Sequence, residues 1–408
     1  MNKIRYFFKQ LKFVKFRDIL AVFSFLIALP ISWFYRLKRK NLWVVCERAN
    51  EARDNGFWFY KYMREKQPQQ DIVYAIKKKS FDYKKVEELG GEVIEFGSLK
   101  HWIYYLTARI NISSQKEGKP NAALCHFLEI YGFLKNRRVY LKHGIVANDL
   151  KWHYYAVTKM WLYICTVQKE LDYCLEKFGY PPNAMVLTGL CRYDNLLSEI
   201  QNENMIFIMP THREWLSRPI KEYKKYDNVF NFTDTEYYKS WRAFLLNEDF
   251  NKKIEEKNIE VVFFLHPNMQ KYTKHFEGLN KNIRIVCSKD ADLQCMMKKA
   301  GLMITDYSSV SFDFAYMRKP LLYYQFDYEK FRKGHYQEGY YSYKDDGFGP
   351  VCLNSVELSQ EVCKILDNNM AIFPQYLDRI EHFFKFHDSE NCKRTYEAII
   401  KRLENEEN

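Results

Sequence analysis

Residues 302–313 read LMITDYSSVSFD, an apolar strand that runs into a polar turn and then into a helix. Hydroxyl groups and free backbone N–H groups at such a turn can bind an anion such as phosphate. We therefore expect Asp306, Ser308 and Ser309 to contact an anionic ligand. Taken alone, the stretch fits equally well a turn in which Asp306 or Ser308 only caps the helix. A strand followed by a turn and a helix is the repeating unit of an α/β fold.

The same unit recurs on both sides of this stretch. Short apolar runs alternate with segments of helical spacing, which favours doubly wound parallel sheets covered by helices on both faces. The expected strands form two sets, the first at 42–46, 72–76, 92–96, 109–113, 138–141 and 185–187, and the second at 205–209, 260–265, 283–287, 302–305 and 321–324. Helices are expected at 57–65, 83–89, 101–108, 127–135 and 293–299.

The length of 408 residues exceeds what one ordinary core supports. The polar stretch 194–204 separates the two sets of strands. We predict two Rossmann-like domains over 41–198 and 199–370 that face each other across a cleft, followed by a helical tail over 371–408. A ligand is expected at the carboxyl ends of the strands.

Lys and Arg together number 63 against 51 Asp and Glu, which gives a formal net charge of +12. Such an excess suits an anionic partner: nucleic acid, anionic lipid or a phosphorylated substrate. No GxxxxGK[ST], GxGxxG or nucleic-acid module signature is present. The 10 cysteines form no metal-spaced pair and indicate a reducing compartment. Asp290 and Asp292 have the spacing of metal ligands, but helix capping explains them better, so no metal site is predicted and a need for a divalent metal stays open.

Residues 1–40 differ from the rest of the chain, because basic residues flank an apolar run over 19–35 on both sides. The run is shorter than the roughly 20 apolar residues of a spanning helix and contains Pro30. No small-residue cleavage site of a secretory signal follows it. We predict contact with an anionic membrane surface, through a helix lying on it or a short re-entrant segment. A helix buried on the core and a true span are the less favoured alternatives.

Two histidines directly follow predicted strands: His143, which precedes Gly144, and His266, which precedes Pro267 and Asn268. A histidine there can accept a proton near neutral pH, because its reference pKa is about 6.5. We therefore expect His143 to act as a base and His266 to lie beside a phosphate. Taken singly, each is more often a structural residue of a turn.

Two further strand ends carry an arginine, the residue type suited to bidentate phosphate contact. Arg192 lies in the segment TGLCRYD, and Arg213 follows Thr211 and His212 in the segment MPTHR. Surface arginines are usually solvated, so neither segment is specific by itself.

Six segments taken together resemble one protein family. They are CERANEARDNGFWFYKYMRE (46–65), LKHG (141–144), TGLCRYDNLL (188–197), MPTHREW (209–215), FLHPN (264–268) and ITDYSSVSFDFAYMRKPLLYYQFD (304–327). In them the chain is similar to the CDP-glycerol glycerophosphotransferases of teichoic-acid and capsule synthesis, over about residues 42–351. The resemblance implies a GT-B-like fold, in agreement with the two Rossmann-like domains expected from the strands.

The resemblance also implies a role for each candidate residue. His143 is expected to deprotonate the acceptor hydroxyl, with His266 as a second catalytic histidine near the donor phosphates. The donor is expected to contact Gly144, Arg192, Thr211, His212, Arg213, Asn268, Asp306, Ser308 and Ser309. The expected reaction is attack of an acceptor hydroxyl on the β-phosphorus of a CDP-polyol, which leaves a phosphodiester and releases CMP.

The implied partners are a CDP-polyol donor, a lipid-linked saccharide or polyol-phosphate acceptor and the cytoplasmic face of the cell membrane, with no nucleic acid. Two departures leave the polyol open: His212 stands where the family often has Trp, and Glu338 where its polymerases can place arginine. The chain lacks the long additional N-terminal region of some polymerases, so we expect single-unit addition at least as readily as processive polymerisation.

Two rival hypotheses stand beside this one. The first is a GT-B glycosyltransferase that uses a nucleotide sugar, because the fold alone does not fix the reaction. The second is a non-catalytic protein that binds membranes or polyanions, which would not need His143 and His266 at strand ends.

Overall fold

The structure is a computed structural model, and it describes residues 16–217, 231–287, 292–334 and 337–407. The basic residues before position 16 and Asp290 therefore lie outside the described residues. The other member of the expected capping pair, Asp292, accepts a hydrogen bond from the backbone N–H of Cys295 and caps helix α14 (Leu293–Lys299), as expected.

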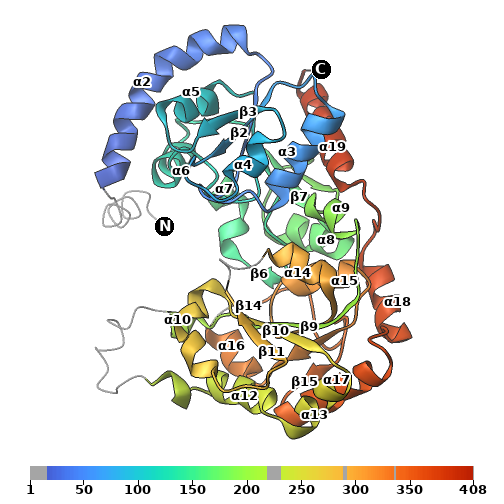
Figure 1. Cartoon of the computed structure of the whole chain (residues 1–408). Coiled ribbons are helices and arrows are strands. Elements are labelled where there is room, and N and C mark those ends of the chain that lie inside the picture. The colour runs from blue at the N-terminus through green and yellow to red at the C-terminus, as the bar shows by residue number, and fades with distance from the viewer. Residues whose placement is uncertain (1–15, 218–230, 288–291, 335–336, 408) are drawn as a thin grey trace.

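The N-terminal sheet has seven parallel strands in the order β3-β2-β1-β4-β5-β7-β8 (Figure 1). Alternate residues of β1 pack into different clusters: Trp43 and Val45 on the side of α3 and α19, and Val44 and Cys46 on the side of α5. Both faces are thus buried, as is typical of a parallel sheet between layers of helices. The strands are β1 (Trp43–Cys46), β2 (Ile72–Ile76), β3 (Glu92–Glu95), β4 (Ile110–Ser113), β5 (Arg138–Tyr140), β7 (Leu162–Cys165) and β8 (Met185–Leu187).

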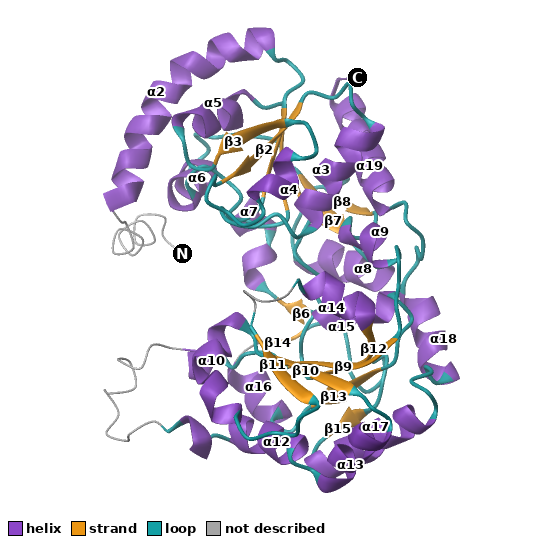
Figure 2. Ribbon diagram, viewed as in Figure 1, coloured by secondary structure: helices purple, strands orange, loops and turns teal. Residues whose placement is uncertain are grey.

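Helices connect these strands and cover both faces of the sheet (Figure 2). They are α3 (Asn55–Lys66), α4 (Tyr83–Glu87), α5 (Leu99–Thr107), α6 (Ala122–Ile130), the 3₁₀ helix η1 (Lys151–His153), α7 (Tyr155–Thr158), α8 (Gln168–Lys177) and α9 (Arg192–Leu196). Together with the sheet they form what we call the N-terminal half.

The C-terminal half is built in the same way on six parallel strands in the order β11-β10-β9-β12-β13-β15. Ile206 and Ile208 of β9 pack into one cluster, and Met205 and Phe207 into the other, so this sheet is also buried on both faces. The strands are β9 (Glu203–Met209), β10 (Glu260–Phe264), β11 (Ile283–Val286), β12 (Ala300–Thr305), β13 (Leu321–Tyr324) and β15 (Val351–Cys352). Its other helices are α10 (Glu214–Ser217), η2 (Phe232–Asp234), α12 (Glu236–Leu245), α13 (Glu248–Glu256), η3 (Pro267–Phe276), α15 (Val310–Tyr316), α16 (Tyr328–Gly334) and α17 (Ser355–Asp367).

The two doubly wound sheets confirm the predicted α/β fold, and each expected strand is present. The prediction omitted β7 and β15 and placed α6 about five residues too late. The side chain of Asn121 accepts a hydrogen bond from the N–H of Leu124 and starts α6 earlier. β9 begins at Glu203 and α17 ends at Asp367, while the domain boundaries at 198/199 and 370/371 remain predictions.

The end of the chain returns to the N-terminal half (Figure 1). Helix α18 (Pro374–Phe383) packs on the C-terminal half, and α19 (Asn391–Glu407) lies beside α3. The carboxylate of Asp194 accepts hydrogen bonds from the N–H groups of Asn391 and Cys392, both at 2.9 Å. A small antiparallel ladder between β6 (Asn148–Asp149) and β14 (Gln337–Glu338) joins the two halves at a further point.

Helix α2 (Phe16–Lys38) lies along α5, where Phe25 contacts Trp102 at 5.6 Å between ring centroids. The guanidinium of Arg36 donates to the carbonyl of Leu106, which fastens the end of α2. The opposite face of the helix exposes large apolar side chains: Ile19, Leu20, Val22, Phe23, Leu26, Ile27, Leu29, Trp33, Phe34 and Leu37. The helix continues through Pro30, and Asp18–Lys38 is long and apolar enough to cross a membrane by length and composition. The length argument against a span therefore does not hold, and α2 is a candidate membrane-associating segment, as expected.

Candidate functional site

A cavity of about 440 Å³ lies between the carboxyl ends of the two sheets. The loops after β4 and β5 line it from the N-terminal half, and the loops after β9, β10 and β12 line it from the C-terminal half. This is the position in which doubly wound folds bind ligands. Seven of the residues expected at the site line the cavity: His143, Gly144, Thr211, His212, His266, Ser308 and Ser309.

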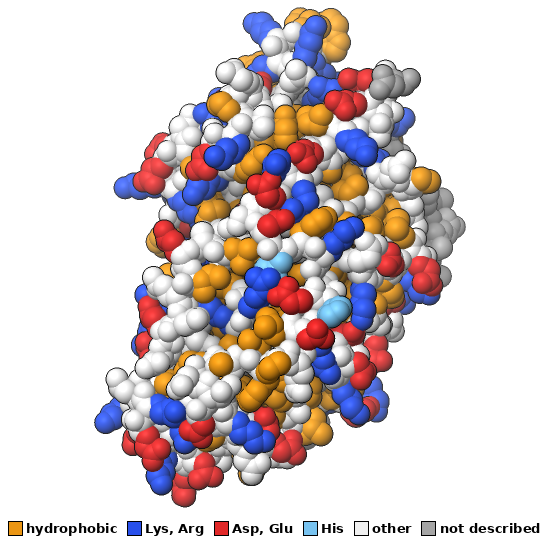
Figure 3. All heavy atoms as spheres, turned by 90° about the vertical axis from the view of Figure 1, so that its right-hand side faces the viewer, with side chains coloured by type: hydrophobic (Ala, Val, Ile, Leu, Met, Phe, Trp, Pro, Cys, Tyr) orange, Lys and Arg blue, Asp and Glu red, His pale blue; other side chains and the backbone are white. Residues whose placement is uncertain are grey.

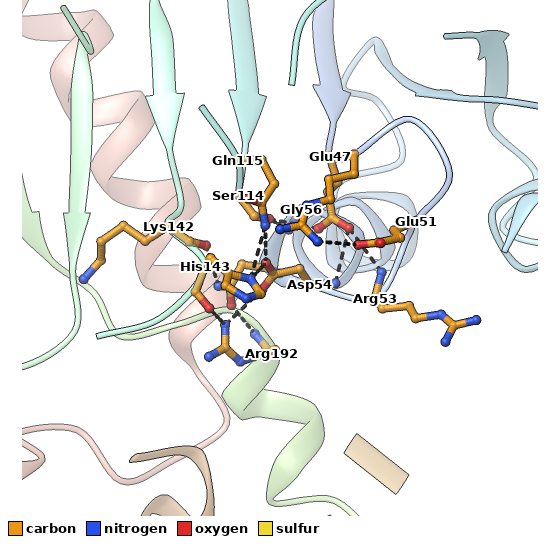
Figure 4. A network of polar contacts seen from close by, with 12 residues as sticks. Glu47, Glu51, Arg53, Asp54, Gly56, Ser114, Gln115, Lys142, His143 and Arg192 are labelled. Carbon is orange, nitrogen blue, oxygen red and sulfur yellow. Dashed lines mark hydrogen bonds and ion pairs between the residues drawn. The ribbon is translucent and has the colours of Figure 1, made fainter. Parts of the chain in front are cut away.

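His143 forms a pair with Asp54, which sequence reasoning missed (Figure 4). The imidazole Nδ1 lies 2.5 Å from the carboxylate Oδ2 of Asp54. The negative charge of Asp54 raises the pKa of His143. Burial opposes ionisation of Asp54, but the positive charges of His143 and Arg192 prevail and lower the pKa of its carboxyl group. An Nδ1–H that donates to Asp54 leaves the Nε2 of His143 free to accept a proton, which is the geometry of an oriented general base.

Asp54 is held in place by the start of α3, which follows β1. Its carboxylate caps the helix by accepting from the N–H of Asn55 at 2.8 Å, and it accepts from the Nε2 of Gln115 at 3.2 Å. The side chain of Asn55 donates to the carbonyl of Lys142 at 2.9 Å, which joins the start of α3 to the residue before His143. The same loop therefore positions both members of the pair.

A second buried carboxylate, Glu47, organises the loop behind Asp54 (Figure 4). It accepts hydrogen bonds from the N–H of Phe57 at 3.0 Å and from the hydroxyl of Ser114 at 2.9 Å. Burial and the nearby charge of Asp54 raise the pKa of Glu47 to about 7. A Cβ added at Gly56 would lie 2.8 Å from Glu47 Oε1, so the close packing here requires glycine.

Lys142 adopts a left-handed backbone conformation with φ 63°, which is uncommon for a residue other than glycine. Its side chain is fully buried, forms an ion pair with Glu170 and lies 3.3 Å from the hydroxyl of Thr166. This buried pair stabilises the turn that presents His143 to the cavity.

Arg192 links the two halves of the molecule. Its guanidinium donates to both carboxylate oxygens of Asp313 in α15, at 2.5 and 2.9 Å, and to Asp54 at 2.9 Å. It also donates to the carbonyl of His143 at 2.7 Å. Arg192 is thus buried behind the His143–Asp54 pair and is not among the residues that line the cavity.

The C-terminal half presents a pair of stacked histidines. The rings of His212 and His266 lie 4.4 Å apart between centroids. The Nδ1 of His266 accepts from the N–H of Asn268 at 3.2 Å, so the neutral ring carries its proton on Nε2. Burial, and then the charge of His212, lower the pKa of His266 to about 4. His266 is therefore a neutral hydrogen-bond donor near pH 7, rather than a cation.

Two more expected residues lie behind the cavity. Arg213 is fully buried between Asp306 at 2.9 Å and Asp327 at 2.7 Å. Asp306 accepts from the backbone N–H groups of Thr211 at 2.8 Å and Tyr307 at 2.6 Å, and so ties the loop after β9 to the loop after β12. Of the described residues that were expected at the site, four do not line the cavity: Arg192, Arg213, Asn268 and Asp306.

The two halves approach each other closely at Gly144. A Cβ added there would lie 3.2 Å from the hydroxyl oxygen of Ser309, which is exposed at the start of α15. Ser308 is partly buried, and its hydroxyl accepts from the N–H of Val310 at 3.3 Å, while Ser309 is the N-cap residue of α15 and makes no side-chain capping hydrogen bond. The turn at residues 306–309 therefore faces His143 across the cavity.

The face seen in Figure 3 carries interspersed basic and acidic side chains without a continuous basic patch. In the part of the chain that the structure describes, no group of three or more His, Cys, Asp or Glu side chains could hold a metal ion.

The cavity between the strand ends of the two halves, with His143 on one side and His266 on the other, agrees with a match to one family. The sequence model of CDP-glycerol:poly(glycerophosphate) glycerophosphotransferase matches residues 27–401. The chain belongs to this family. Asp54 and Glu47 lie in one of the six segments that carry the resemblance, so the glycerophosphotransferase pattern contained them, although only the fold shows their contacts with His143 and Ser114.

Individual relatives support the glycerophosphotransferase assignment. The chain is 30% identical to the minor teichoic acid biosynthesis protein GgaB of Bacillus subtilis (strain 168), over 90% of this chain and 40% of that protein. It is 22% identical to a teichoic acid poly(glycerol phosphate) polymerase of Staphylococcus epidermidis, over 81% of this chain and 46% of that protein. The chain thus spans less than half the length of these relatives.

The fold is that of a solved teichoic-acid polymerase. The wall teichoic acid polymerase TagF superposes with a TM-score of 0.63 at 14% identity, over 96% of this chain and 99% of that chain. This likeness confirms the GT-B-like arrangement of two parallel sheets.

Proposed function

We propose that this chain transfers glycerol phosphate from CDP-glycerol to a hydroxyl group of a lipid-linked acceptor in the synthesis of a teichoic-acid or capsular polymer. The observation that carries the proposal is the Asp54–His143 pair, which faces His266 and the serines of β12–α15 across one cavity. Membership of the glycerophosphotransferase family names the donor.

The proposed reaction begins at His143. Its Nε2 takes the proton of the acceptor hydroxyl, whose oxygen forms a bond to the β-phosphorus of the donor. The bond between that phosphorus and the oxygen bridging to the α-phosphate breaks, and CMP leaves with this oxygen. The imidazolium that forms is stabilised by Asp54, and most of the remaining barrier reduction comes from positioning and from charge stabilisation at the phosphates.

Donor phosphates are proposed to contact residues of the C-terminal half. The neutral His266 can donate its Nε2–H without changing charge, and Ser308 and Ser309 add hydroxyl groups on the facing loop. For Arg192 the buried contacts favour a positioning role, because its guanidinium already serves Asp313, Asp54 and the carbonyl of His143.

The same reasoning favours positioning roles for Arg213 and Asp306, which hold the loop of Thr211 and His212 from behind. Asn268 is proposed to act through its backbone N–H, which fixes the tautomer of His266.

We further propose that the chain works at the cytoplasmic face of the cell membrane, held there by α2. One face of α2 packs on α5, while the opposite face exposes a row of apolar and aromatic side chains. Lys38 and Lys40 follow these side chains and suit anionic headgroups. The contacts with α5 favour a helix that lies at the membrane surface over one that crosses it, because a crossing helix would have to leave them.

The test is CMP release by the purified chain in lipid vesicles, with CDP-glycerol, CDP-ribitol or a UDP-sugar as donor and a lipid-linked disaccharide as acceptor. We expect CMP from CDP-glycerol and its loss in His143→Ala. Release of CMP only from CDP-ribitol would change the polyol. Release of UDP, with no CMP from either CDP-polyol, would refute the phosphotransfer and leave a glycosyltransferase.

A further inference from the structure

The wall of the cavity that faces the proposed donor residues carries a lysine and a tryptophan that so far have no role. Lys116 lies in the loop after β4, and Trp152 lies in η1. Both line the cavity that contains His143, and the Lys116 Nζ lies 6.0 Å from the centroid of the Trp152 ring. They belong to the N-terminal half, whereas the proposed donor contacts come from the C-terminal half.

Lys116 is a cation whose nearby counter-charge, Glu117, only partly offsets the effect of burial on its pKa. Among the described carboxylates, none forms an ion pair with its Nζ within 4.0 Å. Burial lowers the pKa of its ammonium group, which means that the charged form is partly desolvated. A half-buried charge is costly without a partner. The position therefore suits an anionic group of a ligand, and phosphate is the anion that this reaction handles.

Trp152 presents a flat aromatic surface to the same space, with 42% of the residue exposed. Large exposed aromatic rings favour ligands that have an apolar face of matching size. The C–H face of a pyranose ring has this property, whereas a linear glycerol phosphate chain has no ring face to stack. The indole therefore favours a sugar at the end of the acceptor.

Buried contacts hold the backbone in place at both positions. The guanidinium of Arg138 donates to the carbonyl of Lys116 at 3.1 Å, which fixes the loop after β4. His153, the buried neighbour of Trp152, lies 2.8 Å from the hydroxyl of Tyr163 in β7. A surface that is already ordered loses little conformational entropy when a ligand binds.

We infer that Lys116 and Trp152 form the acceptor subsite, and that this subsite takes a lipid-linked acceptor whose terminal unit is a pyranose sugar. The sugar stacks on Trp152 with its hydroxyl at the Nε2 of His143, and a phosphate of the link to the lipid lies at Lys116. The inference rests on the proposed function, because it assigns the second substrate of the same reaction.

The test compares two acceptors, a short-chain lipid diphosphate disaccharide and the same molecule capped with one glycerol phosphate. Trp152→Ala and Lys116→Ala are measured beside the conservative variants Trp152→Phe and Lys116→Arg. Phe81→Ala and Lys79→Ala are matched controls, since both residues are exposed and lie outside the cavity lining. The readouts are KM and kcat for CMP release, the dissociation constant of CDP-glycerol, and the dissociation constant of each acceptor by calorimetry.

For the disaccharide acceptor we expect KM to rise roughly 10- to 100-fold in Lys116→Ala, which loses a charged hydrogen bond. A rise of about tenfold is expected in Trp152→Ala, with recovery in Trp152→Phe. The dissociation constant of CDP-glycerol and the controls should not change. For the capped acceptor, Trp152→Ala should have a smaller effect.

An unchanged KM for the disaccharide acceptor in both alanine variants would overturn the inference while the phosphotransfer stands. Equal effects of Trp152→Ala on the two acceptors would overturn the sugar assignment. If the unmodified chain releases no CMP, the proposed function fails, and the acceptor dissociation constants still decide the subsite: equal binding by the unmodified chain and the variants would overturn it.

Discussion

Replacement of Asp54 by asparagine tests the pair on which the proposed chemistry depends. Asparagine has nearly the same size and is also a good helix N-cap, so α3 should still begin at residue 55. What changes is the negative charge beside the Nδ1 of His143, at 2.5 Å in the structure. The variant therefore removes the charge of Asp54, which faces both His143 and Arg192, and leaves the helix cap in place.

The magnitude follows from the loss of a hydrogen bond between two charged groups, worth about 1.5–3 kcal/mol. The side chain of His143 is 65% exposed and that of Asp54 is 12% exposed. Solvent screens such a pair, so we take the lower end, about 1.5 kcal/mol, which corresponds to about one pKa unit of His143. Loss of orientation adds to this, and we expect kcat/KM to fall about 100-fold, within the range that a general base contributes.

The sign of the pH effect is determined by the direction of the pKa shift. Asp54 raises the pKa of His143 above the ordinary value, and the base acts in its neutral form. Activity of the unmodified chain should thus rise with pH through this raised pKa. Removal of the charge lowers the pKa, so the acidic limb of the profile moves to lower pH by about one unit.

The assay is CMP release from CDP-glycerol over about pH 5 to 8. Glu51→Gln is the matched control, because this exposed carboxylate lies in the same loop and contacts Arg48 instead of His143. An acidic limb that stays in place in Asp54→Asn, or a kcat/KM equal to that of Glu51→Gln, would refute the orientation of His143 by Asp54.

Three further predictions concern other parts of the molecule. His266→Ala should lower kcat for CMP release about 100-fold. Since the pKa of His266 is about 4, its ionisation should not appear near neutral pH in the pH profile of the unmodified chain. An unchanged kcat in the variant would contradict the role of His266 as a hydrogen-bond donor. Arg213→Met should reduce the free energy of unfolding in urea by about 3–5 kcal/mol, because it leaves two buried carboxylates unpaired, and an unchanged midpoint would contradict this. The double variant Phe23→Lys, Leu26→Lys should bind anionic vesicles about 100-fold more weakly in a sedimentation assay, whereas Phe81→Lys should bind as the unmodified chain does. Equal binding by the double variant, the Phe81→Lys variant and the unmodified chain would show that α2 does not contact the membrane.

The sequence predicted the sheets well because parallel strands are uniformly apolar and short. The runs at 72–76 and 260–264 have no other good interpretation, since both their faces are buried. β7 was missed because its run follows Trp161 directly and no polar turn marks its start. The two residues of β6 and the two of β14 carry no pattern, because pairing across the halves depends on how the halves meet.

At the site, the residues on strand ends were predictable and their partners were not. His143 and His266 stand where strands end, which the apolar pattern locates. Asp54 lies eight residues after β1, and only the packing of α3 brings it to His143, 89 positions along the chain. The burial of Arg192 and Arg213 could not be predicted either, because the carboxylates that pair with them lie in helices and loops distant in the sequence.

The ladder between β6 and β14 has a mechanical consequence. In Figure 1 the covalent connections between the halves run on the right, through the segment before β9 and the one between α18 and α19, while the ladder lies farther to the left. The ladder therefore closes an edge of the interface that the connections do not reach, while the buried pair of Arg192 and Asp313 joins the halves near the site. With two residue pairs in the ladder, at about 0.5–1.5 kcal/mol per hydrogen bond, the ladder by itself contributes only a few kcal/mol to holding the halves together. A ligand that contacts both halves adds its binding free energy to that of the ladder and the ion pair.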